Sequence, residues 1–147
     1  MDSLGQWTGD WAWGVPLIVL NVVLHVSGLT AVRSVVLSGK DGSQLSRVVS
    51  SSFTMTTGVA TLLTTVLHGI EASIWAAAYR LLGALPDMKS AMLYSLSAIT
   101  TYGHANIFLK PHWQLMGAME ALNGMLLFGL TTAFLFAVFQ RVWQSEW

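Results

Sequence analysis

Hydrophobic residues are concentrated in three long stretches of the chain, which run from Trp13 to Val32, from Phe53 to Tyr79 and from Trp113 to Trp143. Each stretch is long enough to cross a hydrocarbon core as a helix, which takes about 20 residues. Tryptophan or tyrosine lies near their ends, as expected where a span meets the membrane interface. The pattern therefore predicts an all-α membrane protein with three transmembrane helices.

A shorter apolar stretch, SAMLYSLSAIT, lies between the second and third spans. It is too short to cross the bilayer and too apolar for a free loop in water. Pro86 and Asp87 provide a helix start, and TTYGHAN after the stretch has the glycine and small polar residues of an extended turn. Irregular backbone at membrane depth requires protein or a water-filled cavity around it. We therefore expect a re-entrant pore helix followed by a filter loop.

These elements divide the chain into two regions. Residues 1–52 form an N-terminal segment with an extra transmembrane helix (13–32) and a cytoplasmic loop. Residues 53–147 form a pore domain, for which we expect an outer helix at 53–79, a pore helix at 88–100, a filter at 101–106 and an inner helix at 113–143.

Charged residues predict how the chain is oriented in the membrane. The loop after the first span carries Arg33, Lys40 and Arg47 against Asp41, whereas the opening segment has acids and no bases. The positive-inside rule then places the N-terminus outside and the C-terminus, with Arg141, in the cytoplasm.

The composition excludes several classes of protein. Hydrophobic residues make up 54% of the chain and charged residues 10%, and the seven basic residues balance the seven acidic ones. No basic surface favours nucleic acid, and the absence of cysteine excludes disulfides and thiolate metal sites. Because no nucleophile-base pair, metal-ligand spacing or phosphate-binding glycine motif is present, we expect neither an enzyme nor a resident cofactor.

The segments YSLSAITTYGHANI and WQLMGAMEALNGMLLFGLTTAFLF resemble the two-transmembrane pore-loop family of potassium-channel-like proteins, the bacterial members especially. The resemblance covers about half the chain. It implies a homotetramer in a lipid bilayer, the bacterial inner (plasma) membrane, that conducts potassium or monovalent cations generally. The residues that correspond to the family's filter are Thr101, Tyr102, Gly103, His104, Ala105 and Asn106. Permeant K+ or Na+ would bind at Thr101, Tyr102 and Gly103.

Three filter positions differ from the family pattern. Ala105 replaces the second filter glycine, His104 replaces an aromatic residue, and Asn106 replaces an aspartate. We therefore leave open potassium-selective and non-selective conduction. His104 either makes the outer filter respond to pH, because imidazole titrates near neutrality, or packs behind the filter as a neutral side chain.

The resemblance also implies that the inner helix bends at a glycine to open a cytoplasmic gate. Gly124 is the first candidate for this hinge and Gly129 the second. The alternative for Gly117 and Gly129 is close helix packing through small residues.

Ionisable residues occur inside two predicted spans. His68 and Glu71 share a face of the second span, and Glu120 shares a face of the third with Asn123. Because unpaired carboxylates are costly in a membrane, we expect Glu71 to anchor the back of the pore helix or to pair with His68. Glu120 is given the same filter-supporting role. Acids that face the permeation path instead would concentrate cations.

Two alternative functions remain open. One is a haem- or quinone-associated membrane anchor that uses His25 and His68, which lie on adjacent spans. The other alternative is a non-conducting channel homologue, with a structural or regulatory role, whose filter has collapsed at His104 and Ala105.

Overall fold

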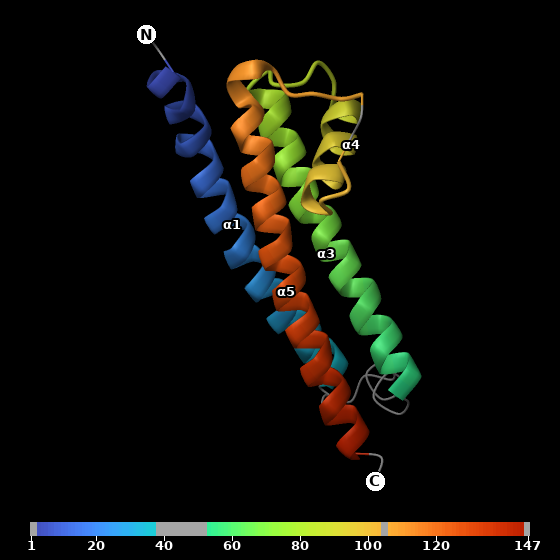
Figure 1. Cartoon of the computed structure of the whole chain (residues 1–147). Helices are drawn as coiled ribbons and strands as arrows, with labels where there is room; N and C mark the ends of the chain where they lie inside the picture. The colour runs from blue at the N-terminus through green and yellow to red at the C-terminus, as the bar shows by residue number, and fades with distance from the viewer. Residues whose placement is uncertain (1–2, 38–52, 104–105, 146–147) are drawn as a thin grey trace. The chain divides into compact units, whose positions relative to one another are not determined.

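The computed structural model describes residues 3–37, 53–103 and 106–145 (Figure 1). It contains three long helices, namely α1 (Ser3–Leu37), α3 (Phe53–Leu81) and α5 (Gln114–Ser145), together with the short helix α4 (Met88–Ile99) and a 3₁₀ helix (Pro111–Trp113). No strand occurs among these described residues. The prediction of an all-α chain is confirmed for this part of the sequence.

The three long helices are compatible with a membrane protein. The segments Trp7–Val36, Phe53–Leu81 and Pro111–Arg141 are each long and apolar enough to cross a bilayer. Large apolar side chains are also exposed along them; Leu62 and Met125, for example, are each 63% exposed. Extended apolar surface is unfavourable in water but not in lipid.

The described residues form two compact units. The first unit comprises residues 1–24 and 69–127, and the second comprises residues 25–68 and 128–147. Each unit takes segments from α1, α3 and α5, and α4 belongs to the first.

The core of the first unit combines large aromatic and methionine side chains with leucines and alanines. Trp75 and Tyr79 of α3 are fully buried, as is Met116 of α5. Leu17 of α1 and Ala91 of α4 belong to the same cluster. Segments of all four helices therefore meet in one core, and α4 lies beside α3 and the first half of α5 (Figure 1).

The chain turns sharply between α3 and α4. Gly83 has a left-handed backbone (φ +64°), and the N–H of Ala84 donates to the carbonyl of Tyr79 at 2.9 Å while the N–H of Gly83 donates to that of Arg80 at 3.2 Å. These two bonds make a Schellman motif, in which the left-handed residue is usually glycine because it has no Cβ to clash.

The first turn of α4 is capped by Asp87. Its carboxylate accepts hydrogen bonds from the backbone N–H of Ser90 at 2.9 Å and from the Ser90 hydroxyl at 2.8 Å. These bonds hold the pKa of Asp87 below its usual value, and the bond from the backbone N–H contributes most to the shift. The helix start predicted at Pro86 and Asp87 therefore has a direct physical cause.

Helix α5 is capped by a residue that is distant in sequence. Asp10 of α1 is only 2% exposed and accepts a hydrogen bond from the backbone N–H of Met116 at 3.0 Å. This N–H belongs to the first turn of α5, where no carbonyl of the helix itself is available. A carboxylate at this position also faces the positive end of the helix dipole.

Small aliphatic side chains form the core of the second unit. Val32 and Val36 of α1 cluster with Ala60 of α3 and Val138 of α5. A Cβ added to Gly28 would lie 2.7 Å from the methyl groups of Leu67. Glycine therefore allows α1 and α3 to approach closely at this point, and a larger residue would require the Leu67 side chain to shift.

Two glycines allow α5 to approach α4 in the first unit. A Cβ added to Gly117 would collide with the Tyr94 hydroxyl, and one added to Gly124 would collide with the backbone carbonyl of Ile99. At Gly129, by contrast, an added Cβ would meet no atom of the described residues within 4 Å. Close packing therefore accounts for Gly117 and Gly124 but not for Gly129.

These contacts predict opposite effects for two alanine substitutions. Gly124→Ala should lower the stability of the protein by about 2 kcal/mol, because the backbone of Ile99 cannot move aside as a side chain would. Gly129→Ala should leave stability unchanged or raise it by up to about 1 kcal/mol through helix propensity. Thermal unfolding of both variants in detergent would measure the difference, and equal losses would contradict the packing described for Gly124.

Candidate functional site

The segment that follows α4 folds back over the C-terminal end of that helix. The N–H of Thr101 donates to the carbonyl of Ala98 at 2.9 Å, and the N–H of Gly103 donates to that of Ser97 at 3.3 Å. The side chains of Thr101 and Tyr102 are nevertheless exposed, Tyr102 by 82%. The chain thus presents these predicted filter residues at the end of α4 rather than burying them.

The sign of the backbone angle φ alternates along this segment. Thr100 has φ −86°, Thr101 has φ +57° and Gly103 has φ +74°, whereas the φ of Tyr102 is not positive. Thr101 directly follows Thr100, the C-cap of α4, at the position where a left-handed residue commonly ends a helix. A positive φ is costly for a β-branched residue such as Thr101, by about 1–3 kcal/mol, and such strain clusters at functional sites.

The remaining predicted filter residues are only partly described. His104 and Ala105 lie outside the described residues, so their replacement of an aromatic residue and a glycine stays a sequence observation. Asn106 is described and exposed.

A groove of about 370 Å³ lies beside the segment. Its lining combines α4, the following loop and α5, and includes Ser97, Thr101, Gly103, Phe108, Gly117 and Ala121. Phe108 is 70% exposed. The first unit therefore has a hollowed surface next to the residues predicted to line a pore.

Glu120 of α5 is the centre of a buried hydrogen-bond network. It is fully buried, and its Oε2 accepts a hydrogen bond from the Tyr79 hydroxyl of α3 at 2.6 Å. Its Oε1 accepts one from the Ser95 hydroxyl of α4, which also lies 2.6 Å from the carbonyl oxygen of Ala72. One carboxyl group therefore links three helices, and it fixes α4 by its third turn.

Other polar residues of the first unit are also buried. Glu71 of α3 has no exposed surface. Asn123, which shares a helix face with Glu120, and Asn21 of α1 are equally buried. Neither asparagine side chain makes a hydrogen bond to the described residues, so the interhelical bond expected for such groups is not formed there.

The two membrane-span histidines meet in the second unit. The Thr131 hydroxyl of α5 lies 3.1 Å from Nε2 of His25 and 3.0 Å from Nε2 of His68. The imidazole centroids are 5.2 Å apart, and the His68 ring stacks on Phe128 at 4.4 Å. Because a hydroxyl has one hydrogen, it can donate to only one of the two imidazoles, so at least one Nε2 is protonated and donates to it. Both Nε2 atoms are thus engaged within the protein, which does not favour the haem alternative.

Several residues of these clusters escape sequence analysis. Tyr79, Ser95 and Thr131 are ordinary residues of apolar stretches, and the side chains that they contact lie at least 25 positions away in the chain. Only the acids and histidines that they contact were identifiable, because an ionisable residue is rare inside a span.

Comparisons with family models, with curated proteins and with solved structures found no match to this chain. The site must therefore be interpreted from its own chemistry.

The Glu120 network predicts a graded series of stabilities. Glu120→Ala should lower the free energy of unfolding by about 3 kcal/mol, because it leaves the Tyr79 and Ser95 hydroxyls buried without this acceptor and removes side-chain volume. Tyr79→Phe, which removes one donor and little volume, should cost about 1–2 kcal/mol.

Glu120→Gln is the matched control, since its amide keeps an oxygen acceptor of similar shape. Denaturant or thermal unfolding in detergent would rank the three variants. If Glu120→Ala were no less stable than Glu120→Gln, the carboxyl would not be linking the helices.

Proposed function

We propose that this chain is one subunit of a homotetrameric cation channel in which α4 is a re-entrant pore helix and residues 101–106 form the filter. The observation that carries the proposal is the run of alternating φ signs at Thr100, Thr101 and Gly103 directly after α4. In the proposed filter, the carbonyl oxygens of this segment replace the hydration shell of a cation.

The length of α4 supports a re-entrant position. Its 12 residues span about 18 Å, whereas the hydrocarbon core is about 30 Å thick. A helix of this length cannot cross the bilayer, and in the proposed arrangement it ends at membrane depth between α3 and α5. Its C-terminal end carries the negative pole of the helix dipole, which favours cations over anions at that depth.

The exposed surface of the filter segment supports an assembly. Three residues from one chain cannot surround an ion, so a filter of this kind requires copies around an axis. Tyr102 and Phe108 are 82% and 70% exposed in the single chain, and the groove beside them is open. These surfaces are available to neighbouring copies.

The glycines of α5 take different roles in this proposal. Gly124 touches the backbone at the end of α4, so a bend there would disturb the support of the filter. Gly129 has open space around it among the described residues, which makes it the better position for a gating hinge. Both were hinge candidates in the sequence, and the contacts favour the second.

The proposed location is a bacterial plasma membrane, with the N-terminus outside and the C-terminus in the cytoplasm. The basic residues Arg33, Lys40 and Arg47 support this orientation. The permeant ion is potassium or a monovalent cation generally, bound at the carbonyls of Thr101, Tyr102 and Gly103.

Ion flux into liposomes that contain the full chain tests the proposal. We expect uptake of K+ and Na+, and we expect Ala105→Gly to raise the preference for K+ several-fold because it restores the family's second filter glycine. Ala31→Gly, on the exposed face of α1, is the matched control and should leave the ion preference unchanged.

Two results would overturn parts of the proposal. Absence of flux at every pH and voltage would exclude conduction and leave a non-conducting homologue. An equal change of ion preference in both alanine-to-glycine variants would remove Ala105 from the filter.

A further inference from the structure

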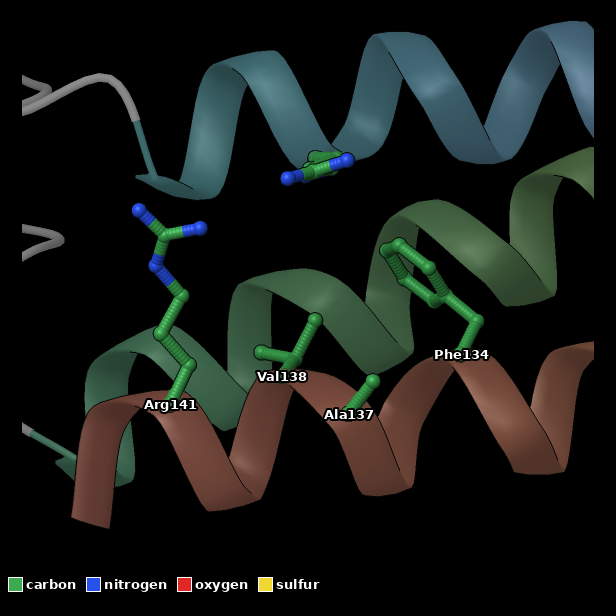
Figure 2. Close-up of a pocket in the computed structure, with 5 residues that line it drawn as sticks. Phe134, Ala137, Val138 and Arg141 are labelled. Atoms are coloured by element: carbon green, nitrogen blue, oxygen red, sulfur yellow. The ribbon is translucent and has the colours of Figure 1, made fainter. Parts of the chain in front are cut away.

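The second unit contains a basic pocket that the proposed pore does not use. It has a volume of about 300 Å³ and is lined by Arg33, Phe134, Ala137, Val138 and Arg141. Figure 2 shows the Arg141 side chain extending from α5 toward α1, with Phe134, Ala137 and Val138 along the same side of α5. The pocket therefore combines charged groups with an apolar wall.

The sequence spacing explains why α5 presents this set of residues. Ala137, Val138 and Arg141 follow Phe134 by three, four and seven positions, which places all four on one helix face. Val138 is 2% exposed and packs in the same core cluster as Val32 of α1, the neighbour of Arg33. The two arginines are thus positioned by a packed contact between α1 and α5.

The pocket carries positive charge without a nearby acid in the described chain. Within the described residues of the second unit, 25–37, 53–68 and 128–145, Arg33 and Arg141 are accompanied by no aspartate or glutamate. Both side chains are exposed. Two guanidinium groups that line one pocket repel each other, and an anion between them turns that repulsion into attraction. A phosphate suits them best, because its oxygens match the planar guanidinium fork.

The polarity of the pocket changes with depth in the membrane. Arg141 is the last residue of its apolar segment, and Arg33 lies three residues before the end of its own. Phe134, seven residues before Arg141, lies about 10 Å further into the segment. The charged mouth therefore lies near the interface and the apolar wall lies deeper, which fits an amphipathic ligand better than a free anion.

We propose that this pocket binds the phosphate headgroup of an anionic phospholipid. The guanidinium groups of Arg33 and Arg141 hold the phosphate, and part of an acyl chain lies against Phe134 and Ala137. Basic pockets between spans on the cytoplasmic side are suited to anionic headgroups. The assignment rests on insertion of the three long helices into a membrane with the proposed orientation, but not on ion conduction.

Titration of the full chain in a non-ionic detergent tests the proposal, with native mass spectrometry to count bound lipid. The probes are dioctanoyl phosphatidylglycerol, dioctanoyl phosphatidylcholine and inorganic phosphate. We expect the anionic lipid to bind more tightly than the other two. Arg33→Gln and Arg141→Gln should each weaken its binding about tenfold, the effect of one lost charge-assisted contact.

Two further variants distinguish the roles of the arginine charges and of the pocket volume. Arg80→Gln removes an exposed arginine at the end of α3 in the first unit, and it should leave the affinity unchanged. Ala137→Trp fills the pocket while keeping both arginines, and it should abolish the preference for the anionic lipid. Since Arg33, Ala137 and Arg141 are exposed, these changes should not impair folding, which circular dichroism would verify.

The outcomes that overturn the proposal are distinct. Equal affinity for the two lipids would exclude recognition of charge, and phosphate binding as tight as lipid binding would identify a free anion as the ligand. Unchanged binding in the Arg33→Gln/Arg141→Gln double variant, or an equal loss in Arg80→Gln, would exclude this pocket. Because these measurements do not involve flux, failure here would be distinguishable from failure of the channel proposal.

Discussion

The first unit depends on one buried carboxyl group. Glu120 accepts hydrogen bonds from Tyr79 of α3 and Ser95 of α4 while it belongs to α5. In an apolar surrounding each of these hydroxyls would be costly without an acceptor, so the network holds the three helices in one arrangement. One turn further along α5, Gly124 lies against the backbone of Ile99, which also holds α5 against α4. Together they determine where α4 ends and hence where Thr101 and Gly103 lie.

The course of the chain was largely predictable from its hydrophobic pattern. Runs of apolar residues long enough to cross a bilayer identify the three long helices, and the structure confirms them for the described residues. The Asp87 cap explains why a helix begins at Met88. Helix α1 begins ten residues before the predicted span, at Ser3, because hydropathy marks the apolar part of a helix and not its polar ends.

The contacts between helices were much less predictable. Asp10 reads as one acid in a tryptophan-rich opening segment, yet it caps α5 across more than 100 residues of sequence. Ser95 reads as a small polar residue in an apolar stretch, although it is the point at which α4 is tied to Glu120. Such pairings depend on which helix faces meet, and a single sequence does not specify this. The histidines, by contrast, were identifiable as a pair but not as partners of Thr131.

In the proposed channel, residues 101–103 line a water-filled path that opens to the outer face. The chain has no cysteine, so Tyr102→Cys would introduce a single reactive thiol for a charged, membrane-impermeant reagent. Trp7→Cys and Gln140→Cys would mark the outer and cytoplasmic sides. The account predicts that Cys at position 102 reacts from the same side as position 7 and that its modification reduces ion flux. Reaction only from the side of position 140, or no reaction while both markers are labelled, would contradict it.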